Sequence, residues 1–311
     1  MIVAALLAAS ACSSATGVAR QGTFDDGPSA TSSAAPSSAA PSSSRAAKPR
    51  PKPKPAPKST TTSCQDTGFP CDLQSRFAAA DSYAGDRPGT TGIVVHDLRT
   101  GATWQNDHAG DLTWTASTIK LAMVVDLYTR QRNGTITLTA DDRALIHQML
   151  HTSDDEAADS LWFKYAGADH MAFNNAFPRY GLTALRPQSG YTKYYPYWGF
   201  QKCTPQDLDR LMTYVLTKLP ASERSSIVDE LRSVAPIQQW GVWGAGPAAS
   251  PGNKDGWSSE DGGWVMNTVG FVGDGERYVV SVMNNLRGEG GYDEGKATVT
   301  QVSKRLFGGY F

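Results

Sequence analysis

The segment Ser117-Thr-Ile-Lys120 places a hydroxyl and an amine three residues apart at the start of an apolar stretch. Residues i and i+3 lie on one face of a helix, so the Lys120 amine can reach the Ser117 hydroxyl. Burial would lower the pKa of the lysine and favour the neutral amine, which can accept the serine proton. The pair is therefore a candidate nucleophile and base, although a capped helix with a solvent-directed lysine has the same spacing.

Two further polar segments follow along the chain. Ser153-Asp-Asp155 comes after an amphipathic stretch, and Lys254-Asp-Gly256 precedes the last apolar stretches. Each has a simpler alternative: Ser153-Asp-Asp-Glu156 fits a helix capping box, and Asn253-Lys-Asp-Gly256 is typical of a turn. The order of the three segments is more specific than any one of them.

With these segments in this order, the chain resembles the penicillin-recognising serine enzymes. These are the class A β-lactamases and the low-molecular-weight penicillin-binding proteins, with motifs S-x-x-K, S-D-N and K-T-G. The resemblance covers about residues 72–307 and includes Gln239-Trp-Gly241 and residues 263–270. It implies that Ser117 is acylated, that Lys120 is its proton partner and that Ser153 relays a proton to the leaving nitrogen.

The resemblance also implies where a substrate binds. Lys254 would attract the substrate carboxylate, and Asp155 stands where the family has an Asn that contacts the substrate amide. The backbone N–H groups of Ser117 and Trp257 would form the oxyanion hole. The substrate-binding residues expected from the second and third motifs are Asp155, Lys254, Gly256 and Trp257.

Three departures from the family pattern concern catalysis. Class A enzymes deacylate through a Glu between the second and third motifs, but no Asp or Glu lies between His170 and Gln206. Asp155 replaces an amide donor, and Asp255 replaces a hydroxyl residue and would repel an anionic substrate unless it points away. We therefore expect acylation with slow deacylation.

Two function classes remain open. One is a serine hydrolase acylated at Ser117 by a β-lactam or a D-Ala-D-Ala-like amide, with an esterase as a minor variant. The other is a non-catalytic envelope lipoprotein that binds peptidoglycan or a protein partner through the same cleft. With 29 Lys+Arg against 30 Asp+Glu, the chain has no net field that would recruit nucleic acid.

The pattern of elements predicts an α+β fold. Apolar stretches at both ends of the folded part predict strands, and the region between about 116 and 219 is helical in pattern. We expect a β-lactamase-like fold, with an antiparallel sheet from both chain ends and an inserted all-helical lobe. The expected elements are helices at 72–83, 116–128, 141–151, 205–216 and 294–306, and strands at 92–98, 102–105, 264–272 and 278–283.

The N-terminal region predicts export. Residues 1–11 are apolar and read as a signal peptide, and Cys12 follows small residues as a lipidated cysteine would; an ordinary cleavage site beside an incidental cysteine is the alternative. Residues 12–63 predict a disordered tether and residues 64–311 the folded domain. We expect a monomer in the bacterial cell envelope, lipid-anchored outside the cytoplasmic membrane and contacting it only through the anchor.

Cysteines and histidines were the remaining candidates for special chemistry. Cys64 and Cys71 would pair in an oxidising compartment, but a bond from Cys203 to either one is also open. His147 and His151 are four residues apart and could form a metal face. Gln148 follows His147, so the H-E-x-x-H pattern of zinc peptidases is absent, and we expect neither metal nor cofactor.

Overall fold

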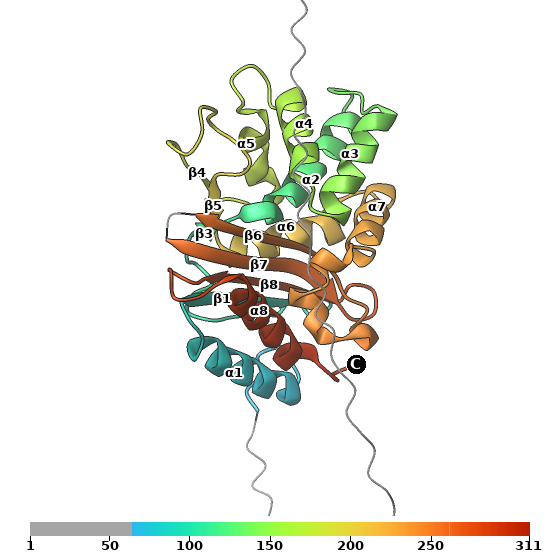
Figure 1. Ribbon diagram of the computed structural model, residues 1–311. Helices are drawn as coiled ribbons and strands as arrows, with labels where there is room; N and C mark the ends of the chain where they lie inside the picture. Colours follow the sequence, from blue (N-terminus) through green and yellow to red (C-terminus); the bar gives the residue numbers. More distant parts are fainter. Residues whose placement is uncertain (1–63, 261) are drawn as a thin grey trace, which may run out of the picture. The chain divides into compact units, whose positions relative to one another are not determined.

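The computed structural model describes residues 64–260 and 262–311, shown in Figure 1. The predicted signal peptide, Cys12 and the tether lie outside the described residues. None of the helices described there is both long and apolar enough to cross a membrane.

A five-stranded antiparallel sheet is built from both ends of the folded part, as predicted. Its strand order is β2-β1-β8-β7-β6. Strand β1, from the start of the folded part, pairs with the last strand, β8, over eight residues, with Val94 opposite Ser281. The strands are β1 Thr90–Asp97, β2 Thr103–Gln105, β6 Gly252–Glu260, β7 Gly263–Val272 and β8 Tyr278–Asn285.

Helices α1 (Cys71–Gly85) and α8 (Tyr292–Phe307) cover one face of this sheet (Figure 1). Their apolar side chains, such as Phe77 and Val302, form one hydrophobic core with the strands. A disulfide joins Cys64 to Cys71 at the start of α1, and Cys203 is buried with a free thiol.

The other face carries the helical lobe (Figure 1). Its central helix α2 is buried at every position from Ile119 to Tyr128, which agrees with its predicted apolar surroundings. A small three-stranded sheet, β3-β5-β4, lies within this region and was not predicted. The elements are α2 Ile119–Arg132, α3 Ala140–His151, α4 Asp155–Tyr165, α5 Ala172–Ala176, α6 Pro205–Lys218, α7 Ala221–Arg232, β3 Thr113–Trp114, β4 Arg186–Pro187 and β5 Gln201–Cys203, with 3-10 turns η1 Ala116–Thr118, η2 Phe177–Tyr180, η3 Pro236–Gln238, η4 Gly241–Ala245 and η5 Pro247–Ala249.

Two local alternatives are wrong. Asn253–Gly256 is not a turn, because these residues pair with β7 as part of β6. Ser153 does not cap α4, since Asp154 accepts the hydrogen bond from the Ala157 N–H at 2.7 Å. Ser153 instead has a left-handed backbone with φ of 63°.

Candidate active site

Ser117 lies in the 3-10 turn η1, immediately before α2. The preceding Ala116 has a φ of 44°, a conformation that L-residues rarely adopt and that surrounding contacts must maintain. Gly256 of β6 passes against this turn: a Cβ atom there would lie 2.8 Å from the Ser117 backbone nitrogen and 2.7 Å from that of Thr118. The close approach therefore requires glycine at 256 and holds Ser117 beside the edge strand.

Ser117 lines a cavity of about 250 Å³. Of the residues predicted to bind substrate, Asp155 and Trp257 also line it, whereas Lys254 does not. The full lining is Ala116, Ser117, Asp155, Tyr197, Trp198, Gly199, Phe200, Trp257, Ser258 and Glu260. The wall thus combines the Ser117 hydroxyl, two carboxylates and several aromatic rings.

The Lys120 side chain is fully buried behind this cavity. Its Nζ donates to the Ser153 carbonyl oxygen at 2.7 Å and to Asp155 Oδ1 at 2.5 Å, and lies 4.6 Å from the centre of the Trp198 ring. Burial lowers the pKa of Lys120, and the Asp155 carboxylate opposes this shift. Among hydrogen bonds between described residues, none joins Lys120 Nζ to Ser117 Oγ. The Lys120 amine is therefore held in place by its hydrogen bonds to Asp155 and Ser153.

Lys254 is also fully buried, and its amine contacts three protein acceptors. Nζ lies 2.9 Å from Ser153 Oγ, 2.5 Å from Gln238 Oε1 and 2.8 Å from the carbonyl oxygen of Asp255. Burial holds the pKa of Lys254 well below its usual range, and the nearby Lys120 lowers it further. In this arrangement Lys254 positions the Ser153 hydroxyl, and its contact with a substrate carboxylate stays a prediction.

Asp255 does not face Ser117. Successive residues of a strand point to opposite faces. The polar groups that act on Asp255 are Thr268 of β7, its strand neighbours Asn253 and Lys254, and Lys296 of α8, the helix on the far side of the sheet from α2. Burial raises the pKa of Asp255 well above its usual range, which favours the neutral carboxylic acid. A neutral carboxyl group on this face would not exert the repulsion of an anionic substrate that the sequence suggested.

The aromatic wall is fixed by a carboxylate that the sequence did not single out. Asp159 of α4 accepts hydrogen bonds from the Tyr197 hydroxyl at 2.5 Å and from Trp198 Nε1 at 2.7 Å. The segment 171–205, which contains no acid, thus presents aromatic rings to the cavity. Glu260, at the end of β6, brings a carboxylate to the cavity from a different element.

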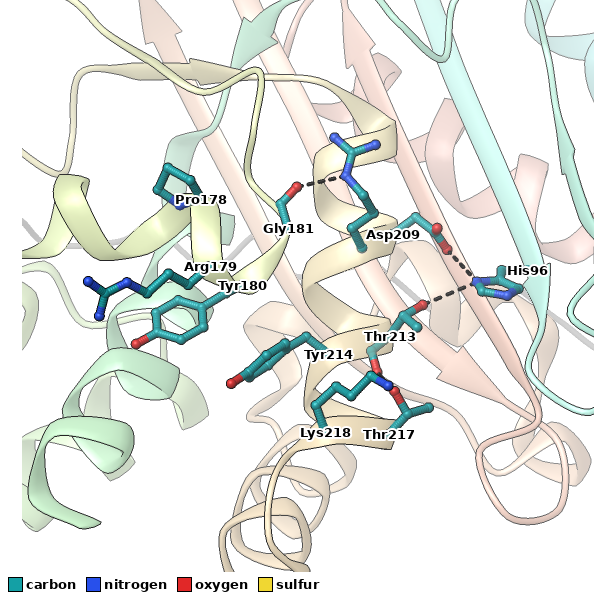
Figure 2. Close-up of a pocket in the computed structure, with 11 residues that line it drawn as sticks. His96, Pro178, Arg179, Tyr180, Gly181, Asp209, Thr213, Tyr214, Thr217 and Lys218 are labelled. Atoms are coloured by element: carbon teal, nitrogen blue, oxygen red, sulfur yellow. Dashed lines mark hydrogen bonds and ion pairs between the residues drawn. The ribbon is translucent and has the colours of Figure 1, made fainter. Parts of the chain in front are cut away.

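Figure 2 shows a different pocket, of about 260 Å³, beside α6. There His96 Nδ1 lies 3.2 Å from Thr213 Oγ1 and 3.6 Å from Asp209 Oδ1. A hydroxyl–histidine–carboxylate triad uses one ring nitrogen for the nucleophile and the other for the carboxylate. Because both partners here contact the same nitrogen, this set ties β1 to α6 and does not form a triad.

Comparison with solved structures identifies the architecture. A β-lactamase from Xanthomonas campestris superposes with a TM-score of 0.61 at 16% identity, over 76% of this chain and 96% of that one. A β-lactamase from Streptosporangium roseum gives 0.61 at 17%, over 75% and 97%, and the protein PBP-A gives 0.60 at 20%, over 76% and 95%. The fold is β-lactamase-like. This confirms the predicted fold class.

Sequence comparison gives a relative that is named as a lipoprotein and not as a β-lactamase. A mycobacterial protein named "Putative lipoprotein LppW", from Mycobacterium tuberculosis and Mycobacterium bovis, is 26% identical over 246 residues. The match spans 76% of this chain and 75% of that protein. No protein-family model matches the sequence.

Proposed function

We propose that this protein is a serine acyl-transferring hydrolase, acylated at Ser117 by a β-lactam or a D-Ala-D-Ala-like amide and deacylated slowly. The observation that carries the proposal is the location of Ser117 in the cavity wall, with the buried amines of Lys120 and Lys254 converging on Ser153 behind it. A lysine of lowered pKa close to a serine can accept the hydroxyl proton. The β-lactamase-like fold supports the same reaction class.

In this proposal the reaction begins with a proton transfer from the Ser117 hydroxyl to the Lys120 amine. The Ser117 oxygen then attacks the amide carbonyl, and the leaving nitrogen receives a proton through Ser153, whose hydroxyl contacts Lys254. The N–H groups of Ser117 and Trp257 are proposed to bind the oxyanion. Glu260, the second carboxylate of the cavity lining, is proposed to activate water for deacylation.

A labelling experiment tests the proposal. Incubation with a fluorescent penicillin, followed by intact-protein mass spectrometry, should give one adduct that is lost in Ser117→Ala. Ser258→Ala is the matched control, because Ser258 lines the same cavity and lies on β6. An adduct that survives in Ser117→Ala would place the nucleophile elsewhere. No adduct in the wild type, together with binding of peptidoglycan fragments, would favour the non-catalytic envelope module.

The cellular location belongs to the same proposal. The name of the mycobacterial relative supports an exported, lipid-anchored protein of the cell envelope, with Cys12 as the anchored residue. A tether between the anchor and the domain would let Ser117 reach substrates away from the membrane surface.

A further inference from the structure

Two histidines and a glutamate from neighbouring helices meet on the surface of the helical lobe. His147 and His151 lie one turn apart on α3, with ring centroids 4.9 Å apart and planes inclined by 16°. Glu230 comes from α7, and its two carboxylate oxygens each lie 2.9 Å from His147 Nδ1. One ligand atom from each of the three residues lies within 4.8 Å of the others.

An ordinary histidine–carboxylate pair does not account for this cluster. Such a pair explains the contact of His147 with Glu230, but it leaves out His151. The Nδ1 atom of His151 is buried and makes no hydrogen bond to any described residue. A buried ring nitrogen without a partner is costly, so this atom indicates a ligand that the protein itself does not supply.

We propose that His147, His151 and Glu230 form a binding site for one divalent transition-metal ion, of which Zn²⁺ matches the ligands best. Two imidazoles and a carboxylate suit zinc, whereas calcium and magnesium prefer oxygen ligands only. Tetrahedral zinc with bonds of about 2.1 Å places its ligand atoms about 3.4 Å apart, so side-chain rotations would close the present set. The sequence shows the two histidines four residues apart, but it gives no sign that Glu230 of α7 lies beside them.

The position of the site gives the ion a structural role. It would tie the end of α3 to α7, two helices that pack together. The carbonyl oxygen of His151 accepts from Gln238 Nε2 at 3.0 Å, and Gln238 Oε1 accepts from Lys254. The ion would therefore fix the end of α3 close to the residues that hold Lys254. This inference does not depend on acylation of Ser117.

Titration of the tag-free, full-length protein with Zn²⁺ in a calorimeter tests the site. All five histidines of the chain lie in the described part, so the structure places every histidine that could compete for zinc. We expect one Zn²⁺ per chain and a higher melting temperature in excess zinc. His147→Gln and His151→Gln should each weaken binding by about tenfold or more. Ser117→Ala should bind zinc like the wild type.

His108→Gln is the matched control, because His108 also contacts a carboxylate, Asp111, at 2.9 Å but has no second histidine beside it. Equal weakening in this control, or wild-type affinity in both site variants, would overturn the proposal, as would a wild type that neither binds nor is stabilised by zinc. If a histidine variant does not fold, Glu230→Gln decides. Its Co²⁺ complex should lose the visible absorption of a low-coordinate site, and retention of that absorption counts against the proposal.

Discussion

The charge at position 155 should control how readily Lys120 accepts a proton. Asp155 Oδ1 lies 2.5 Å from Lys120 Nζ, and this carboxylate stabilises the ammonium against the effect of burial. Asp155→Asn keeps an oxygen that can accept the same hydrogen bond but removes the negative charge. The pKa of Lys120 should therefore fall, and a larger fraction of the amine should be neutral at a given pH.

The distance and exposure of this pair give a conservative magnitude. The Asp155 side chain is 73% exposed, so we use the dielectric constant of water, which gives the smallest interaction energy. Two unit charges 2.5 Å apart in water interact by about 1.7 kcal/mol. A change of this size in the free energy of deprotonation raises the fraction of neutral amine about 17-fold, and the rate by the same factor where that fraction limits acylation.

Acylation kinetics across a range of pH can measure this effect. Under pseudo-first-order conditions with a fluorescent penicillin, Asp155→Asn should be acylated about 17-fold faster on the acidic side of the pH profile. The acidic limb should also move to lower pH. Glu156→Gln is the matched control, since it removes the same charge from the adjacent, exposed residue of α4.

Two results would refute this reasoning. If Asp155→Asn acylates at the wild-type rate with an unshifted acidic limb, Lys120 is not the base that limits acylation. If Glu156→Gln gives the same acceleration, the effect comes from the combined negative charge of the acidic side chains in the first turn of α4. In that case the direct contact with Lys120 has no special role.

Three further outcomes are expected. Stopped-flow measurements with nitrocefin should show a burst stoichiometric with enzyme and then slow turnover. Glu260→Gln should slow only the turnover phase. Rapid turnover without a burst contradicts slow deacylation. The pKa of His96 is raised above its ordinary value of 6.5, chiefly by Asp209. The pairing of His96 with Asp209 therefore stabilises the fold fully below pH 6.5, and this contribution is lost as the pH rises through the raised pKa of His96. Asp209→Asn should reduce this decline in the free energy of unfolding, which urea denaturation at several pH values measures. An unchanged decline argues against the interaction of His96 with Asp209. Cys12→Ser should release the protein into the medium, whereas Cys203→Ser should leave it in the membrane fraction; retention of the Cys12 variant contradicts lipid anchoring.

The sheet and most helices could be predicted because their sequence patterns are local. The structure has the expected apolar strands at residues 264–272 and 278–283 and the expected buried helix after Ser117. The first of the sheet's late strands was missed. Residues 253–256 have a turn-like composition, but pairing with β7 along the whole of β6 overrides that local preference.

The site's electrostatics could not be predicted, because they depend on contacts between distant residues. The sequence placed Ser117 and Lys120 one turn apart, but it gave no sign that Asp155, 35 residues later, holds the lysine. Likewise, Asp159 binds two aromatic residues almost 40 positions away. Only the folded chain shows which of several carboxylates face the cavity.

The same contacts explain why acylation and deacylation are expected to separate. In the cavity wall, Asp155 is engaged by Lys120, and the aromatic segment fixed by Asp159 supplies no carboxylate. The groups proposed for serine activation come from α2, Ser153 and β6, which are buried together, whereas Glu260 lies at the end of a strand. In the proposed mechanism, acylation therefore relies on buried groups, and deacylation relies on Glu260 at the end of β6. This division favours an enzyme that retains its acyl group over one that turns over rapidly.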